Sequence, residues 1–414
     1  MIYYYQLLFA LIFLISLPYL SFIVIFKRNS REGLNERLGI YAPALKKRLK
    51  GLNDPIWAHA ASVGEIKLLA KIPNFPYHDT VITCVTSSGK KIAQKLFPQT
   101  CVVLLPIDFI VLIKRFKKLV RPSKVVIMET ELWPGFIYSI KKIPVLIFNG
   151  RLSEEKYHIY YRFRRAFRKI FEWVDVIYAK DKENYLRYRK MGVPAYKLKI
   201  MGDLKYLFYL PRTVSIDARY LKPEHMVLVC GSTHKKEEEI LLDVYKGLRD
   251  KYRSLSIILS PRHLERIPGI EELLKKNKLE YVLWSRKKTN TKPAEVILVD
   301  TMGELNKIYS LASIVFIGGS LVPVGGHNLV EAAIWKKPII IGRYYANFRE
   351  MVDLFRKNGG VRVAINKEDL YNILDSLLAE SLGLREMMGR INYNTAMNKK
   401  DEVNGSLREI RNLI

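Results

Sequence analysis

The chain is poor in cysteine and in acidic residues. Its 414 residues include three cysteines, Cys84, Cys101 and Cys230, whose spacing shows no pairs. This argues against a disulfide framework and a zinc ribbon, and it favours a reducing, cytosol-facing location for the main body. Lysine and arginine total 69 against 40 acidic residues, which gives a formal net charge of +29. A field of this sign attracts nucleic acid, anionic lipid or a phosphorylated substrate, and the charge alone does not distinguish them.

Several nucleotide-binding motifs are also missing. The sequence contains neither the P-loop pattern Gly-x-x-x-x-Gly-Lys-Ser/Thr nor the dinucleotide pattern Gly-x-Gly-x-x-Gly, so a nucleoside triphosphatase or a dinucleotide enzyme is poorly supported. It has no Asp-x-Asp, so a metal-bound diphosphate leaving group has no obvious pair of ligands. Lysines, arginines and helix dipoles would have to offset the charge of a leaving group instead.

The N-terminal segment lacks charge altogether. Residues 2–26 are mostly Leu, Ile, Phe and Tyr, and a helix over them, at about 1.5 Å per residue, is longer than the ~30 Å hydrocarbon core of a bilayer. No basic stretch precedes it and no clear cleavage site follows it, which argues against a removed signal peptide. Lys27, Arg28 and Arg31 follow at once, so the positive-inside rule places the rest of the chain in the cytoplasm. Pro18 leaves open whether the helix spans the membrane or re-enters it, and a buried core helix is the alternative.

Beyond residue 55, short apolar runs alternate with helical patterns, which predicts βαβ units and parallel sheets. The alternation breaks near residues 205–218 and then resumes. We therefore predict an α/β protein with a membrane anchor at 1–27 and two Rossmann-like, doubly wound domains, at 28–210 and 211–414, with ligands in the cleft between them. The expected strands are 56–59, 81–85, 102–105, 125–128, 145–148 and 176–178 in the first domain, and 226–230, 256–259, 281–284, 296–299, 314–317, 338–341 and 361–364 in the second.

A basic and aromatic segment covers residues 156–190. Its apolar residues share one helical stripe, which we expect to face the core; they are Phe163, Phe167, Ile170, Phe171 and Val174. The arginines beside the stripe would lie against anionic headgroups or a phosphorylated lipid, or else form a merely solvated face. Mixed basic and aromatic residues also occur in nucleic-acid platforms, but the apolar N-terminal segment favours a membrane.

The most informative stretch is a glycine-rich turn between a strand and a helix. Residues 318–320 follow the strand 314–317, and residues 325–331 lead into the next helix. Glycines let the backbone approach a ligand closely, and the free N–H groups of a first helical turn bind phosphate. Glu331 lies in that turn, where it can accept hydrogen bonds from sugar hydroxyls. The sequence therefore predicts a nucleotide-sugar phosphate site here.

Acidic residues follow two strands of the first domain. Residues 60–64 form a small-residue turn after the strand 56–59, and Glu65 then begins a helix. Glu65 could act as a general base toward a sugar hydroxyl, or it could simply cap the helix. Glu129 and Glu131 follow the strand 125–128, with Trp133 and Pro134 after them. A substrate-facing loop and a capped helix with a packed tryptophan explain that pattern equally well.

Polar turns also follow three strands of the second domain. Residues 232–234 offer hydroxyl and N–H groups to a phosphate or a sugar acid; for His234 we favour solvation over a metal shared with Glu237, because no second histidine is near in the sequence. Arg262 could pair with a phosphate or lie free on the surface. Gly303 and Glu304 follow the strand 296–299. Capping explains each turn singly, whereas a shared cleft explains all of them.

Together these segments resemble the 3-deoxy-D-manno-octulosonic acid (Kdo) transferases of lipopolysaccharide synthesis, which are membrane-anchored glycosyltransferases of the GT-B fold. The matching segments lie in the family's order over nearly the whole chain, at 36–39, 59–65, 128–134, 151–153, 232–234, 261–263, 300–305 and 318–331. The resemblance implies transfer of Kdo from CMP-Kdo to a lipid A precursor at the cytoplasmic face of the inner membrane. It implies no metal, no cofactor and no nucleic acid.

The resemblance also assigns roles to residues. The family's general base falls on Glu65, which would give inversion at the sugar, and its transition-state stabilisers fall on Glu129 and Lys205. Contacts to CMP-Kdo fall on Pro261, Arg262, Met302, Gly303, Glu304, Gly319, Ser320, Asn328, Leu329, Val330 and Glu331.

The chain departs from the family's pattern at two places. Leu329 stands where the family usually has proline, which at a first helical turn only pre-organises the backbone, so binding should persist. Lys235 and Lys236 replace the usual Glu or Gln followed by Gly, which affects contacts near the sugar carboxylate. Two rival functions are a GT-B transferase that uses a UDP-sugar and a non-catalytic, membrane-tethered polyanion-binding protein. The second rival leaves the repeated Gly and acid turns at strand ends unexplained.

Overall fold

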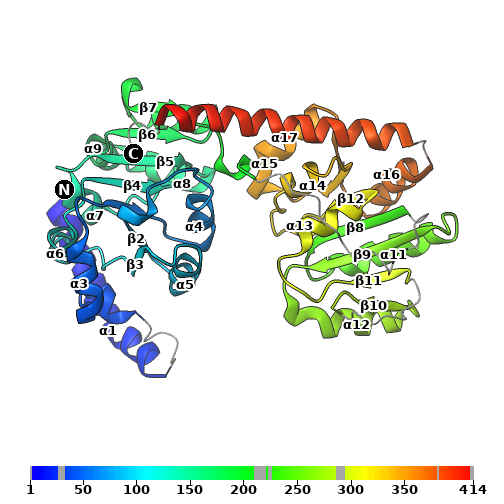
Figure 1. The fold of residues 1–414 in the computed structure, drawn as a ribbon, viewed down its shortest axis with the longest axis horizontal. Coiled ribbons are helices and arrows are strands. Elements are labelled where there is room, and N and C mark those ends of the chain that lie inside the picture. The colour runs from blue at the N-terminus through cyan, green and yellow to red at the C-terminus, as the bar shows by residue number, and fades with distance from the viewer. Residues whose placement is uncertain are drawn as a thin grey trace. The chain divides into compact units, whose positions relative to one another are not determined.

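The computed structural model describes residues 2–26, 33–208, 221, 226–285, 294–379 and 382–410. The chain divides into two compact units, Met1–Phe208 with Lys400–Ile414 and Tyr209–Lys399. Each unit is built on a parallel seven-stranded sheet with helices packed against it (Figure 1). The final helix, α17 (Leu382–Ile410), begins in the second unit and ends in the first. This corrects the prediction that all of 211–414 belongs to the second domain. Most of the linker expected near 205–218 lies outside the described residues.

The first sheet has the strand order β3-β2-β1-β4-β5-β6-β7. Its predicted strands are present, with ends that differ from the prediction by at most two residues: β1 (Ile56–His59), β2 (Thr80–Cys84), β3 (Cys101–Leu104), β4 (Lys124–Met128), β5 (Val145–Gly150) and β6 (Val176–Ala179). The edge strand β7 (Leu198–Ile200) was missed, because Lys199 interrupts its apolar residues and only Leu198 is buried, so it does not read as an apolar run. The order turns outward in both directions from β1 and β4, as in a doubly wound sheet.

The helices of the first unit begin where the sequence supplies start signals. Thr86 and Ser62 cap two of them through their hydroxyl oxygens, and Pro134 and Pro43 occupy first helical positions. The helices are α1 (Ile2–Phe26), α2 (Leu34–Arg37), α3 (Pro43–Gly51), α4 (Val63–Leu69), α5 (Ser87–Leu96), α6 (Ile110–Val120), α7 (Pro134–Ile140), α8 (Glu154–Arg162), α9 (Arg164–Glu172) and α10 (Lys182–Lys190).

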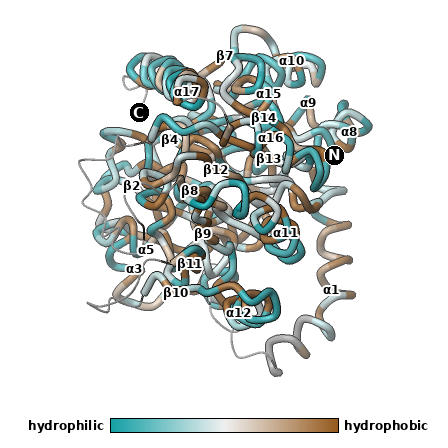
Figure 2. Tube along the Cα trace, turned by 90° about the vertical axis from the view of Figure 1, so that its right-hand side faces the viewer, coloured by the Kyte–Doolittle hydropathy of each residue, from teal (hydrophilic) through white to brown (hydrophobic). Residues whose placement is uncertain are grey.

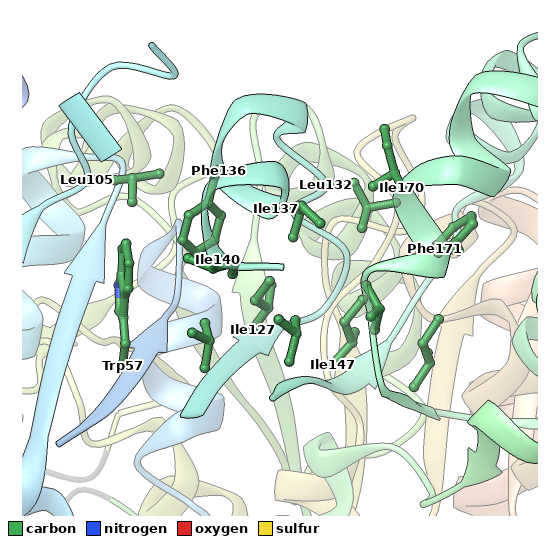
Figure 3. Packing of buried hydrophobic residues seen from close by; sticks show 14 of the residues in the cluster. Trp57, Leu105, Ile127, Leu132, Phe136, Ile137, Ile140, Ile147, Ile170 and Phe171 are labelled. Carbon is green, nitrogen blue, oxygen red and sulfur yellow. The ribbon is translucent and has the colours of Figure 1, made fainter. Parts of the chain in front are cut away.

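The core of the first unit lies between its sheet and helices α6, α7 and α9 (Figure 3). Trp57 on β1 packs against Phe116 and Phe136, with ring centroids 4.8 and 4.9 Å away. Its indole N–H donates to Thr83 Oγ1 at 2.8 Å, so the one polar atom of this buried ring is satisfied. The strands are buried on both faces, which explains why they read as continuous apolar runs rather than alternating ones.

The part of the basic and aromatic segment that carries the predicted stripe is not one helix, because it is divided between α8 and α9. Chain direction changes at Phe163, which separates α8 from α9 and is exposed, so the predicted stripe is wrong at its first position. Ile170, Phe171 and Val174 are buried in the core as expected. The stripe therefore starts at α9, where the helix meets the sheet.

The second sheet has the order β10-β11-β9-β8-β12-β13-β14. All seven predicted strands are present: β8 (Met226–Thr233), β9 (Leu255–Pro261), β10 (Tyr281–Leu283), β11 (Val296–Leu298), β12 (Ile314–Ile317), β13 (Ile339–Gly342) and β14 (Val361–Ala364). The helices are α11 (Glu237–Arg249), α12 (Ile267–Lys276), α13 (Leu305–Ile308), α14 (Val330–Ala333), α15 (Arg349–Lys357) and α16 (Lys367–Ala379), besides α17. Since all strands run parallel, the turns after β8, β9, β11 and β12 share one edge.

Helix α1 is 25 residues long and carries no charge. Its segment Ile2–Tyr19 is long and apolar enough to cross a membrane, and 6% of this segment is buried. Figure 2 shows brown, hydrophobic turns of α1 that stand clear of the neighbouring elements. A core helix would be mostly covered, so the core-helix alternative is wrong.

Candidate functional site

Glu65 lies in the first turn of α4, directly beyond the end of β1. Ser62 Oγ accepts from the Glu65 N–H at 3.3 Å and donates to Glu65 Oε1 at 2.9 Å, while Glu65 Oε2 accepts from the Ala61 N–H at 2.8 Å. These bonds form a variant of the capping box, in which the carboxylate accepts from the N–H of Ala61 rather than from that of the cap residue Ser62, and Glu65 is only 7% exposed. The two interpretations of Glu65 are compatible, because capping fixes the carboxylate in position.

The environment of Glu65 makes it a proton acceptor near neutral pH. Burial raises the pKa of Glu65 to about 7, and the nearby carboxylates Glu129 and Glu131 also raise it, against the two hydrogen bonds that lower it. A carboxylate with an ordinary pKa would be a much weaker base at pH 7. A pKa close to the working pH is what general base catalysis requires.

Glu129 follows β4 at the neighbouring strand end. Its backbone is left-handed, with φ of 56°, and its N–H donates to Phe148 O of β5 at 2.8 Å. Such a φ costs energy in a non-glycine residue and often occurs at functional sites. Burial raises the pKa of Glu129, whereas the positive charges of Arg151 and Lys205 lower it. The charges of Glu129, Arg151 and Lys205 therefore interact with one another.

Lys205 reaches this group from the loop after β7. Burial lowers the pKa of Lys205, Asp203 raises it and Arg151 lowers it. The loop is held by Asn149, whose Oδ1 accepts from the Leu204 N–H at 3.0 Å, and by Asp203 Oδ1, which accepts from the Lys205 N–H at 2.9 Å. Sequence reasoning gave no role to Asn149 or Asp203. The polar Asn-Gly pair that ends β5 was an available signal.

The glycine-rich turn of the second unit is held by a buried carboxylate. Glu237, at the start of α11, accepts from the N–H groups of Gly319, Ser320 and Leu321 at 2.6, 2.9 and 2.8 Å, and from His234 at 2.9 Å. The N–H groups of this first part of the turn therefore already have an acceptor, whereas the phosphate contacts predicted from the sequence are those of the helical turn that follows. Glu237 acts as a built-in anion, and the turn keeps its shape through it.

The rest of the glycine-rich stretch is closely packed. Ser320 is buried, donates its hydroxyl to Ile317 O at 2.5 Å and accepts from the Gly342 N–H at 2.8 Å. A Cβ at Gly318 would lie 2.4 Å from Ser232 O, so only glycine fits there. Asn328 Oδ1 accepts from the Val330 N–H at 3.1 Å at the start of α14. Leu329 and Val330 are buried, and Glu331 is exposed.

Three histidines meet beside this turn. His234 Nε2 and His327 Nε2 are 2.9 Å apart, and the His263 ring lies edge-on to His234 with centroids 5.5 Å apart. Burial lowers the pKa of His327 to about 4, with Arg262 and His234 lowering it further, and burial also lowers the pKa of His234. The sequence interpretation of His234 as a lone solvated residue is wrong. In the part of the chain that the structure describes, no three His, Cys, Asp or Glu residues are placed to hold a metal ion.

The remaining predicted donor contacts lie on the neighbouring strand ends. Pro261 ends β9, and Arg262 is exposed after it, with its N–H bonded to Thr233 O at 3.0 Å. After β11, Glu304 Oε2 accepts from Trp284 Nε1 at 2.8 Å and from Thr301 Oγ1 at 2.7 Å. These bonds shape the turn that presents Met302 and Gly303, both of which are exposed.

The two lysines that depart from the family's pattern are exposed at the start of α11. Lys236 has φ of 76°, a left-handed conformation that glycine adopts at no steric cost. Glycine is the residue that the resemblance implies at this position. Lys236 therefore adopts the turn at the expense of backbone strain, and the two lysines add two positive charges beside it.

The structure thus gathers the predicted residues into two groups. Glu65, Glu129 and Lys205 form the first, at the strand ends of the first unit. The predicted donor residues form the second, along the shared edge of β11, β9, β8 and β12 in the second unit.

Comparison with solved structures defines the class of protein. The chain is similar to the UDP-N-acetylglucosamine 2-epimerase from Neisseria meningitidis bound to UDP-GlcNAc, with TM-score 0.58 and 12% identity over 86% of this chain and 100% of that one. It is also similar to Anabaena HepE in complex with UDP, with TM-score 0.60 and 12% identity over 87% of this chain and 99% of that one. The chain has the GT-B fold.

Sequence relatives define the family. Residues 32–208 match the family described as 3-deoxy-D-manno-octulosonic-acid transferase (kdotransferase). The 3-deoxy-D-manno-octulosonic acid transferase of Haemophilus influenzae is 33% identical over 401 residues, 93% of this chain and 91% of that protein. The enzyme of the same name from Chlamydia muridarum is 30% identical over 89% of this chain and 87% of its own length. The chain belongs to the Kdo transferase family.

Proposed function

We propose that this chain transfers Kdo from CMP-Kdo to a hydroxyl of a lipid A precursor, with inversion and with Glu65 as general base. The observation that carries the proposal is Glu65 itself: a buried carboxylate with a pKa of about 7, fixed by a capping box, in a member of the Kdo transferase family. The first domain would bind the acceptor and the second the CMP-sugar.

In the proposed step the acceptor oxygen forms a bond to the anomeric carbon of Kdo while the bond from that carbon to the CMP phosphate breaks. The electron pair of the broken bond leaves on CMP, and the acceptor proton passes to Glu65 on the opposite face of the sugar. Positive charge develops at the sugar, as in glycoside hydrolysis. Glu129 would stabilise that charge, and Lys205 would stabilise the departing phosphate.

The second unit supplies the donor contacts in this proposal. Arg262 is exposed beside the three histidines and would pair with the CMP phosphate. The exposed acid Glu331 would accept hydrogen bonds from the ribose, and the turn at 302–304 would frame the nucleotide. Gly319 and Ser320 would shape the turn rather than donate their amides to the ligand, because Glu237 already accepts from their N–H groups.

Membrane attachment completes the proposal. Helix α1 would hold the enzyme on the cytoplasmic face of the inner membrane, where the phosphorylated lipid acceptor lies. The net charge of +29 would favour an anionic lipid surface. The proposed reaction uses no cofactor and no nucleic-acid partner.

The mass of the product tests the substrates directly. We expect the detergent-solubilised protein, given CMP-Kdo and a tetra-acylated lipid A precursor, to produce a lipid heavier by one or more Kdo units, and CMP to inhibit the reaction better than UDP. Unchanged lipid mass with CMP still bound would point to another sugar or acceptor. Stronger inhibition by UDP than by CMP would favour a UDP-sugar transferase. Lipid binding without turnover would favour a polyanion-binding protein.

The pH dependence of turnover tests the base. Since Glu65 must be ionised and its pKa is about 7, kcat/KM should fall about tenfold per pH unit below that value. Unfolding caused by protonation of Glu65 should not account for the fall in activity at low pH. The folded pKa lies above the ordinary value of 4.5, so ionisation of Glu65 destabilises the fold as pH rises through this window, and acidification relieves that cost. A flat profile from pH 5 to 8, with chemistry shown to limit the rate, would contradict the assignment.

A further inference from the structure

Helix α1 is bonded to the first unit near its N-terminal end. Tyr5 OH donates to Asp108 Oδ2 at 2.9 Å, Gln6 Nε2 donates to Asp108 O at 2.8 Å, and Gln6 Oε1 accepts from the Ile110 N–H at 2.9 Å. Farther along the helix, Phe9 and Phe13 pack edge-on against Phe109, with ring centroids 5.2 and 5.4 Å away. One side of its first three turns is therefore docked on the segment 108–110.

Asp108 joins this helix to the interior of the unit. It is buried, and its carboxylate also accepts from the N–H groups of Gly135 and Phe136 at 2.9 and 2.6 Å, at the start of α7. Those bonds satisfy two amides that no helix can satisfy internally. The docking site is therefore built from the same residues that begin α7, which makes it part of the fold.

The chain that follows α1 is bonded to residues just before this segment. Arg37 O accepts from the Ile107 N–H at 2.9 Å, and Glu36 Oε2 accepts from the Leu104 N–H at 2.8 Å. Ile107 and Ile110 are three residues apart, so their amides lie within about 10 Å of each other. A helix that crossed a bilayer would separate the chain before and after it by the ~30 Å hydrocarbon core. Both sets of bonds cannot be made if α1 spans.

The opposite side of α1 has no cover in the described part of the chain. Leu7, Leu11 and Ile15 are each more than half exposed, whereas Tyr5, Phe9 and Phe13 on the docked side are partly covered. Tyr4, which is also exposed, precedes this strip and follows Tyr3 at the docked end. An apolar strip of this length, if left in water, would cost free energy in proportion to its area. Beyond Phe13 the helix continues for about 20 Å at 1.5 Å per residue, less than a full bilayer core.

Cationic and aromatic side chains lie next to the docked end. Tyr3 pairs edge-on with Tyr138 of α7, over whose ring the ammonium groups of Lys141 and Lys114 lie at 4.2 and 5.9 Å. Trp173 meets Tyr138 with centroids 5.2 Å apart. Tyrosine, tryptophan and lysine are the residues that collect at the headgroup level of a membrane, where the lysines pair with lipid phosphates.

We propose that α1 does not span the membrane but dips its exposed strip into one leaflet of an anionic bilayer, with its N-terminus on the same side as the catalytic body. The occupant of the strip is lipid, because the strip is apolar and its border is cationic and aromatic. This inference rests on the membrane attachment proposed above and decides between the spanning and re-entrant alternatives.

Thiol labelling tests the topology. Cys84, Cys101 and Cys230 are buried, so a cysteine introduced at the surface is the reactive one. We expect Tyr4→Cys in the full chain to react with a membrane-impermeant maleimide in inverted inner-membrane vesicles and not in intact spheroplasts. The matched control is Tyr196→Cys, which is equally exposed at 79% on the body of the first unit. Both positions should label to the same extent on the same face.

The outcomes separate the two proposals. Labelling of Tyr4→Cys in spheroplasts, or on neither face while detergent restores it, would overturn the one-sided topology. Failure of the protein to sediment with membranes would instead contradict the attachment itself.

A cross-link adds an independent readout of the docking. The double variant Phe13→Cys with Phe109→Cys should form a disulfide in native membranes, which mass spectrometry would detect as a linked peptide. The control pair Leu14→Cys with Phe109→Cys should not, since Leu14 is exposed. Absence of the 13–109 link would count against docking.

Discussion

Replacing Glu65 with glutamine is expected to lower turnover by roughly 10²–10⁴-fold, the range typical for loss of a general base. Glutamine keeps the size of the side chain and an oxygen that can accept from the Ala61 N–H, so the capping box is largely preserved. The measurement is single-turnover product formation with CMP-Kdo, with CMP affinity determined separately. CMP affinity should stay as in the wild type, because the proposed donor contacts lie in the other unit.

The thermal midpoint separates lost chemistry from lost folding. At pH 8 the ionised Glu65 is disfavoured by burial, so Glu65→Gln should unfold at the same temperature as the wild type or higher. The matched control is Glu154→Gln, since Glu154 also follows a capping serine but is exposed. That variant should retain full turnover. Near-full turnover of Glu65→Gln with unchanged binding would remove Glu65 as the base.

Replacing Glu237 with alanine should destabilise the second unit strongly. The substitution leaves four N–H groups, those of His234, Gly319, Ser320 and Leu321, without their acceptor. A buried donor without a partner costs about 1–3 kcal/mol, so the loss should be at least ~3 kcal/mol in the free energy of unfolding, even if water reaches part of the turn. The measurement is chemical denaturation, with CMP affinity as a second readout because the turn belongs to the proposed donor site.

Glu239→Ala provides the control for this prediction. Glu239 lies in the same first turn of α11 but is exposed, so its loss removes a favourable interaction with the helix dipole worth only about 0.3–1 kcal/mol. If Glu237→Ala unfolded at the same denaturant concentration as Glu239→Ala and bound CMP normally, the carboxylate would not organise the glycine-rich turn.

Local sequence patterns were sufficient for the elements and for the kinds of residue at the strand ends. Parallel strands buried on both faces read as short apolar runs, so thirteen of the strands in the two sheets could be placed, and only the three-residue β7 escaped. The same patterns placed Glu65 and Glu129 at strand ends, because each follows an apolar run within a few residues. The break in helical pattern at Phe163 and the return of α17 to the first unit were not visible, since both depend on what packs against them.

The sequence by itself determined the α/β class, the apolar N-terminal helix and, through its motifs, the Kdo transferase family. Only the tertiary structure decided which polar groups are already satisfied. Glu237 reaches amides more than eighty residues away, Asn149 holds the loop that carries Lys205, and His327 pairs with a distant His234. It also decided that the N-terminal part of α1 and the chain that follows α1 both attach to residues 104–110. The physical reason is that strand order brings distant turns together, and a local pattern of side chains carries no record of which turn will lie opposite it.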